Sequence, residues 1–107
     1  MSYDIDLVTR TVDGVKVNVH QSNITYNVRP MLELAGLGPS LHDLNGSEVR
    51  AVLPAMDRAW WALRHESEDI RQLEATNGWG TFDQMLPWFK KLYRDMRLHP
   101  SAILEVW

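Results

Sequence analysis

A dense run of polar side chains, from His20 to Arg29, is the part of this sequence best equipped for chemistry. Eight of its ten side chains can form hydrogen bonds, and they include imidazole, amide, phenol and guanidinium groups. We expect the run to join a strand to a helix, where free backbone N–H groups and the helix dipole favour an anion. The ligand site predicted there uses six residues: His20, Asn23, Thr25, Tyr26, Asn27 and Arg29. In the alternative, the same groups cap the helix and satisfy the backbone at the corner.

Tryptophan supplies the second group of candidates, with five in 107 residues. Trp79 lies between Gly78 and Gly80 in a predicted connection, and Trp61 follows Trp60 on a predicted helix. Adjacent helical residues point about 100° apart, so Trp60 fits the inward stripe and Trp61 should lie to the side or in solvent. We therefore predict Trp61 and Trp79 as anchors for a protein partner. The alternatives are that Trp79 covers the edge of the core and that Trp61 is buried under residues 66–76.

The sequence contains no familiar catalytic or metal-binding pattern. It has no cysteine and four histidines: His20, His42, His65 and His99. No two of these histidines have the i, i+4 spacing of a helical metal pair, and Ser22, Ser40 and Ser47 have no nucleophile-elbow context. We assign no catalytic residue, no metal ligand and no cofactor, and we rank a hydrolase or nuclease that uses His20 or His42 last.

Length and charge bound the class of protein. A chain of 107 residues has room for one domain, spanning 1–107. The net charge of −3, with acidic and basic residues well mixed, argues against a protein that tracks nucleic-acid phosphates. No window approaches the roughly 18–20 apolar residues of a membrane span, and the acidic N-terminus is unlike a secretory signal. We therefore expect a cytoplasmic protein with neither nucleic acid nor membrane as its partner.

Hydrophobic periodicity predicts an α+β fold. Residues 3–9 and 15–20 alternate around Asp13-Gly14, which predicts a hairpin with valines 15, 17 and 19 turned inward and His20 turned outward. Residues 103–107 are expected to return and pair with this hairpin. Three to four helices, predicted over 27–35, 47–65, 67–75 and 81–98, should pack on one face of the small sheet.

The ends of these helices also have sequence signals. Asn27, Ser47, Ser67 and Thr81 are the predicted N-caps, and Gln84 has capping-box spacing from Thr81. Apolar residues at core-facing positions complete the prediction: Ile5, Leu7, Val17, Val19, Met31, Leu53, Met56, Trp60, Leu86, Phe89 and Leu92.

Three stretches together suggest a family. They are Asn-Ile-Thr-Tyr-Asn at 23–27, Asn-Gly-Trp-Gly-Thr at 77–81 and the ending from His99 to Val106. The combination resembles a group of small proteins encoded by bacteriophages and prophages, especially of actinobacteria, for which no activity is established. The resemblance covers most of the chain. It implies an accessory protein acting in the cytoplasm of an infected bacterial host, and it carries over no catalytic residue.

Three functions follow from these features, in descending order. The first is a non-enzymatic phage accessory protein that binds a host protein, for which the resemblance and the tryptophans argue. The second is a protein that binds or sequesters a small anionic or nucleotide ligand at the polar run. The third is a small hydrolase or nuclease.

Overall fold

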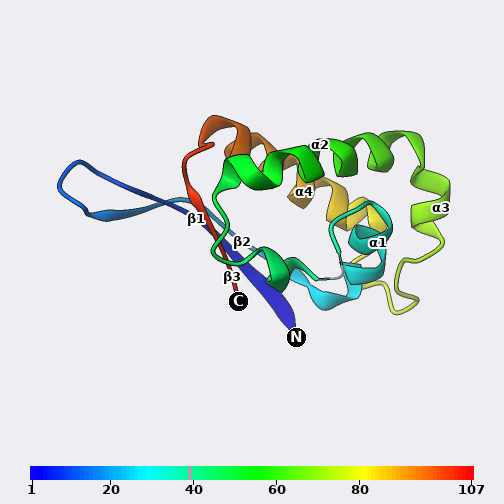
Figure 1. The fold of residues 1–107 in the computed structure, drawn as a ribbon. Coiled ribbons are helices and arrows are strands. Elements are labelled where there is room, and N and C mark those ends of the chain that lie inside the picture. Colours follow the sequence, from blue (N-terminus) through cyan, green and yellow to red (C-terminus); the bar gives the residue numbers. More distant parts are fainter. Residues whose placement is uncertain (39) are drawn as a thin grey trace.

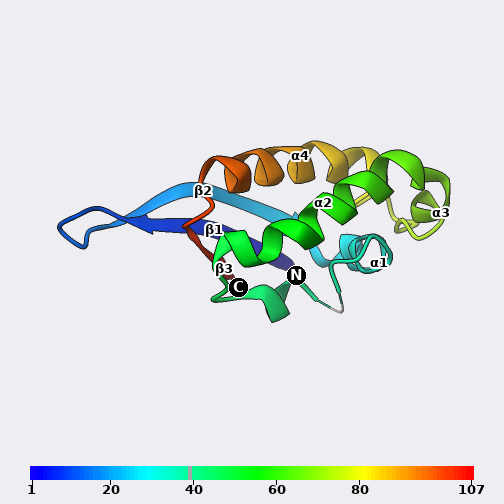
Figure 2. The ribbon, with the colours of Figure 1, turned by 45° about the horizontal axis from the view of Figure 1, so that its top comes forward.

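The fold is α+β, as predicted, with a three-stranded antiparallel sheet and helices on one face of it (Figures 1 and 2). The computed structural model describes residues 1–38 and 40–107. Its elements in chain order are β1 (Ser2–Arg10), β2 (Lys16–Thr25), the 3₁₀ helix η1 (Tyr26–Val28), α1 (Arg29–Leu34), the 3₁₀ helix η2 (Leu41–Leu44), α2 (Val49–His65), α3 (Ser67–Arg71), α4 (Phe82–Leu98) and β3 (Ile103–Val106).

The predicted hairpin is confirmed, and its strands are longer than the sequence indicated. Ser2 pairs with Thr25 at one end and Arg10 with Lys16 at the other. The turn between the strands extends beyond the helical layer (Figure 1), and the molecule measures 47 Å along its longest axis. Val15 and Val17 are exposed there because no helix covers this part of the hairpin, so the prediction that both turn inward, and that Val17 lies in the core, is wrong.

A β-bulge changes which residues of β2 face the core. Leu7 pairs with His20 and Val8 with Asn18, so the register passes over Val19. One extra residue shifts the alternation of every side chain that follows it. His20 is consequently buried, at 5% exposure, and the prediction that it faces outward is wrong.

The C-terminal strand returns to the hairpin as predicted. β3 pairs antiparallel with β1, with Ile5 opposite Val106 and Val8 opposite Ile103, which gives the strand order β2-β1-β3. The other edge of β3 is bonded to the segment before α2, where Gly46 donates to the Leu104 carbonyl at 2.7 Å. β3 is therefore hydrogen-bonded on both of its edges.

The start of α4 matches its sequence signal. Thr81 accepts the backbone N–H of Gln84, and the Gln84 side chain accepts the backbone N–H of Thr81, which completes the predicted capping box. This cap sets where α4 begins, and α4 lies above β2 (Figure 2). The site described below is built between these two elements.

The other predicted caps are wrong. Thr25 caps η1 by accepting the Asn27 N–H, while the Asn27 side chain bonds elsewhere. Glu48, not Ser47, precedes α2, and no side chain caps that end. Ser67 is the first residue of α3 instead of its cap, and α3 ends at Arg71, short of the predicted 75. The Asn27 side chain is thus used by another contact, and the N–H groups of Val49 and Arg50 at the start of α2 donate to the carbonyls of Ala102 and Pro100.

The core lies between the sheet and the helices. Six predicted core residues are buried: Ile5, Leu7, Met31, Met56, Phe89 and Leu92. Four others are only partly buried and pack against it: Val19, Leu53, Trp60 and Leu86. Within the described residues, no helix is long and apolar enough to cross a membrane.

Candidate functional site

Two polar segments singled out in the sequence meet in the fold. The Asn27 amide donates to the Trp79 carbonyl at 3.2 Å and so joins η1 to the connection before α4. Gly80 packs directly against the end of β2, where a Cβ on this residue would lie 2.5 Å from Thr25 Cγ2. Its φ of +76° also belongs to the left-handed region. Glycine is therefore required at position 80 for the two segments to approach this closely.

The segment Asn77–Thr81, called the Trp79 loop below, is held by bonds on both sides of the tryptophan. The Asn77 side chain accepts the Trp79 N–H at 3.0 Å, and the Gln84 side chain accepts the Gly80 N–H at 2.8 Å. Trp79 itself is 72% exposed. The loop thus presents a large aromatic side chain to solvent on a fixed backbone.

Trp61 is the second exposed tryptophan that the sequence indicated. It is 52% exposed on α2, and its ring lies 4.9 Å from that of His65, one helical turn further on. Trp60, its neighbour, turns inward and stacks on Phe89 at 6.1 Å between ring centroids. The predicted exposure of Trp61 and Trp79 is confirmed, and their role in binding a partner stays a prediction.

The polar run at 20–29 is mostly strand, because β2 continues to Thr25. Side chains in a strand alternate between faces, so His20 lies under α4 while Asn23 lies on the other side. The Asn23 amide donates there to Ser2 Oγ at 2.8 Å and to Asp4 Oδ1 at 2.7 Å. The six residues of the predicted ligand site are thus divided between two faces of the sheet and the η1 turn.

The remaining members of that predicted site lie at the turn. The Tyr26 hydroxyl is 3.5 Å from His42 Nε2, and its ring packs on Tyr3 at 4.5 Å. Asn27 bonds to Trp79 as described, and Arg29 begins α1 as an exposed residue. These side chains contact the protein's own groups, as the structural alternative expects. Ligand binding by this set stays a prediction.

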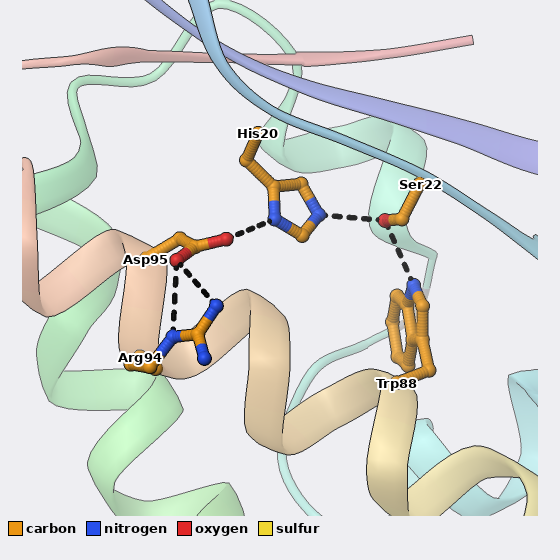
Figure 3. Close-up of polar contacts among 5 residues, drawn as sticks. All are labelled: His20, Ser22, Trp88, Arg94 and Asp95. Carbon is orange, nitrogen blue, oxygen red and sulfur yellow. Dashed lines mark hydrogen bonds and ion pairs between the residues drawn. The ribbon is translucent and has the colours of Figure 1, made fainter.

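A buried polar network joins β2 to α4 (Figure 3). His20 Nδ1 lies 2.7 Å from Asp95 Oδ2, and His20 Nε2 lies 2.7 Å from Ser22 Oγ. The Trp88 indole N–H donates to Ser22 Oγ at 3.0 Å, and Arg94 donates Nε and Nη2 to Asp95 Oδ1, each at 3.2 Å. A carboxylate at Asp95 accepts from His20 Nδ1–H, and Ser22 Oγ forms the second hydrogen bond of the imidazole, at Nε2.

The Asp95 carboxyl is held in its charged form by this network. Burial of the carboxyl raises its pKa, and the hydrogen bonds from His20 and Arg94 together with their charges lower it by more. The pKa of Asp95 therefore lies below its ordinary value. A charged, nearly buried acceptor holds both the imidazole and the guanidinium in place.

Ser22, His20 and Asp95 have the connectivity of a serine-hydrolase triad. Acyl transfer further requires that a carbonyl carbon reach the serine oxygen and that donors surround the developing oxyanion. Here Ser22 Oγ already contacts both His20 and the Trp88 indole, and the His20 side chain has no exposed surface. The arrangement is suited to fixing β2 against α4 more than to attacking a substrate.

Two features of the sequence fit this network once the register of β2 is known, although the predicted site did not include Ser22 or Asp95. His20, Ser22 and Ile24 alternate along one strand, and Asp95 lies three residues after Leu92 on the apolar side of α4. A charged residue at such a position usually has a buried partner. No local pattern identifies a partner 75 residues away, which only the folded chain supplies.

Comparisons with protein-family models, curated proteins and solved structures found no match. Within the part of the chain that the structure describes, no group of three or more His, Cys, Asp or Glu side chains is arranged to hold a metal ion.

Proposed function

We propose that this chain is a non-enzymatic accessory protein of bacteriophage or prophage origin that binds a host protein through the Trp79 loop. The observation that carries the proposal is the combination of a fixed backbone with a tryptophan that is 72% exposed. The two segments that meet at this loop, 23–27 and 77–81, also carry the resemblance to phage proteins.

A rigid, exposed indole is well suited to protein binding. A tryptophan side chain can bury about 150–250 Å² against a partner, and such residues are among the commonest energetic anchors of interfaces. Ordering a flexible loop on binding costs free energy. The bonds to Asn27, Asn77 and Gln84 already order this loop in the free protein, so little of that cost remains.

Trp61 is the second proposed anchor. Its ring lies beside His65 near the C-terminal end of α2, where neither contributes to the buried core. An exposed aromatic pair on a regular helix offers a partner a preformed apolar surface. The partner would contact one or both tryptophans.

The test is capture of a host protein followed by titration of the purified pair. Trp79→Ala and Trp61→Ala are compared with Trp107→Ala, a matched control because Trp107 is also exposed, at 54%, and lies at the C-terminal end of the sheet. All three variants should keep the wild-type melting temperature. Trp79→Ala should weaken binding by at least about 2 kcal/mol, or roughly 30-fold.

Trp107→Ala should bind the partner as the wild-type protein does. A partner that binds equally well to the Trp79→Ala and Trp61→Ala variants would remove the basis of this proposal. Failure to capture any protein in stoichiometric amount from a lysate of the host bacterium would also contradict the proposal.

A further inference from the structure

A groove with basic walls runs along the outer side of α4 beside α2. It encloses about 550 Å³, within the roughly 300–1,000 Å³ of small-molecule sites. The residues that line this basic groove are Trp60, Leu86, Pro87, Lys90, Lys91, Tyr93, Arg94 and Arg97. None of them belongs to the Trp79 loop or to the predicted ligand site at 20–29.

Four of the eight lining residues are cations, and none is a carboxylate. Lys90, Arg94 and Arg97 recur at helical spacing along one face of α4, and seven residues of helix span roughly 10 Å. The chain as a whole carries a net charge of −3. The groove is therefore positively charged on a protein that is negatively charged overall. Like charges at such spacing repel one another, and an anion between them would remove that repulsion.

Aromatic rings form the floor of the basic groove and hold its cations in place. The Arg97 guanidinium lies 4.5 Å from the centroid of Tyr93, and Lys90 Nζ lies 6.0 Å from that of Trp60. Arg64, on α2, lies 5.1 Å from the Trp60 ring and adds another cation at the margin. The Tyr93 hydroxyl donates to Asp57, which fixes its ring.

The buried network also positions one wall of the groove. Arg94 donates Nε and Nη2 to Asp95, so its guanidinium is oriented from beneath by a carboxylate that is already bonded to His20. An oriented guanidinium loses less freedom when it binds an oxyanion than a free side chain does.

We infer that the basic groove binds a nucleotide bearing two or more phosphates. The phosphates would contact Lys90, Lys91, Arg94 and Arg97, because guanidinium and ammonium groups form charge-assisted hydrogen bonds with phosphate oxygens. The base would pack on Leu86 and Pro87, the apolar side chains that line the groove, because the Trp60 ring already contacts Phe89 and the cations of Arg64 and Lys90. A long nucleic acid would extend past the groove onto the surface of a net acidic protein, which disfavours it.

Isothermal titration with ATP, at about 50 mM salt and again at high salt, tests this assignment. We expect ATP to bind more tightly than inorganic triphosphate, and salt to weaken both. The double variant Lys90→Gln/Lys91→Gln should weaken ATP binding at least about tenfold. Its matched control, Arg10→Gln/Arg50→Gln, removes the same charge from exposed residues on the hairpin and α2, outside the groove, and should change the affinity less than about twofold.

Four results would overturn the inference. One is no heat with either probe, and another is equal loss of affinity in the groove variant and its charge-matched control. A third is binding of triphosphate as tight as that of ATP, which would remove the base from the site. The fourth is displacement of ATP by a poly-glutamate peptide or a single-stranded oligonucleotide at lower concentration, which would assign the groove to a macromolecular anion.

Discussion

Removing the Asp95 carboxylate should strongly destabilise the protein. In the Asp95→Ala variant, the Nδ1–H of His20 loses its acceptor, and the His20 side chain has no exposed surface through which water could replace it. A buried donor left without a partner costs the full penalty of its desolvation. Arg94 loses its contact as well, although this side chain is 60% exposed.

The magnitude follows from these two contacts. A hydrogen bond to a charged group contributes about 1.5–3 kcal/mol, and an exposed ion pair about 0–1 kcal/mol. The free energy of unfolding should therefore fall by about 2–4 kcal/mol in Asp95→Ala. For a domain of this size each kcal/mol shifts the melting temperature by roughly 4–8 °C, so a loss of more than about 8 °C is expected.

Chemical denaturation of Asp95→Ala, His20→Ala and the double variant measures the coupling between the two residues. The cycle should give an interaction free energy of at least about 1 kcal/mol. Arg94→Gln is the control, because it removes only the exposed contact and should cost less than about 1 kcal/mol. If Asp95→Ala costs no more than Arg94→Gln, the buried bond to His20 does not hold β2 against α4.

The same network predicts an acid-dependent loss of stability. The pKa of Asp95 is lowered in the folded protein, so its contribution is complete above the ordinary aspartate pKa and is lost as the pH falls through the folded-state value. Asp95→Asn should therefore lose less stability than the wild-type protein between pH 7 and pH 3. Equal losses in the two proteins would show that Asp95 does not titrate with folding.

Two further predictions concern the Trp79 loop and the core. Gly80→Ala should cost more than Gly78→Ala, because a Cβ at 80 meets Thr25 Cγ2 at 2.5 Å whereas a Cβ at 78 has nothing within 4 Å. Both positions have positive φ, so about 1–2 kcal/mol of backbone strain is common to the two variants, and equal melting temperatures would show that the close contact is absent. Phe89→Ala should cost about 3–5 kcal/mol at its fully buried site, and Leu53→Ala less, because Leu53 is only partly buried. Urea denaturation of both variants checks this order.

The fold was predictable to the extent that its signals are local. Alternation and an Asp-Gly turn predicted the hairpin, and the Thr81–Gln84 spacing predicted the start of α4. The caps at Asn27 and Ser47 were wrong because other contacts took their place. The Asn27 side chain bonds to the distant Trp79, and the N–H groups of Val49 and Arg50 at the start of α2 donate to the carbonyls of Ala102 and Pro100, each at 2.9 Å.

The candidate sites were likewise predictable only where their signals are local. Exposure of Trp61 and Trp79 could be predicted, because each departs from an inward stripe within its own segment. The His20 network could not, because a single bulged residue at Val19 decides which side of β2 faces α4. Sequence patterning with period 2 contains no sign of that shift, and a one-residue error reverses every later assignment in the strand.

The bulge at Val19 connects local backbone geometry to the surface of the protein. Because Val19 has no partner on β1, His20 faces inward, where it bonds to Asp95. Asp95 in turn accepts both bonds from Arg94, a residue that lines the basic groove. One irregularity in an edge strand is thus linked, through His20 and Asp95, to a guanidinium that lines the groove. A change that repaired the bulge would disturb the groove without altering any residue in it.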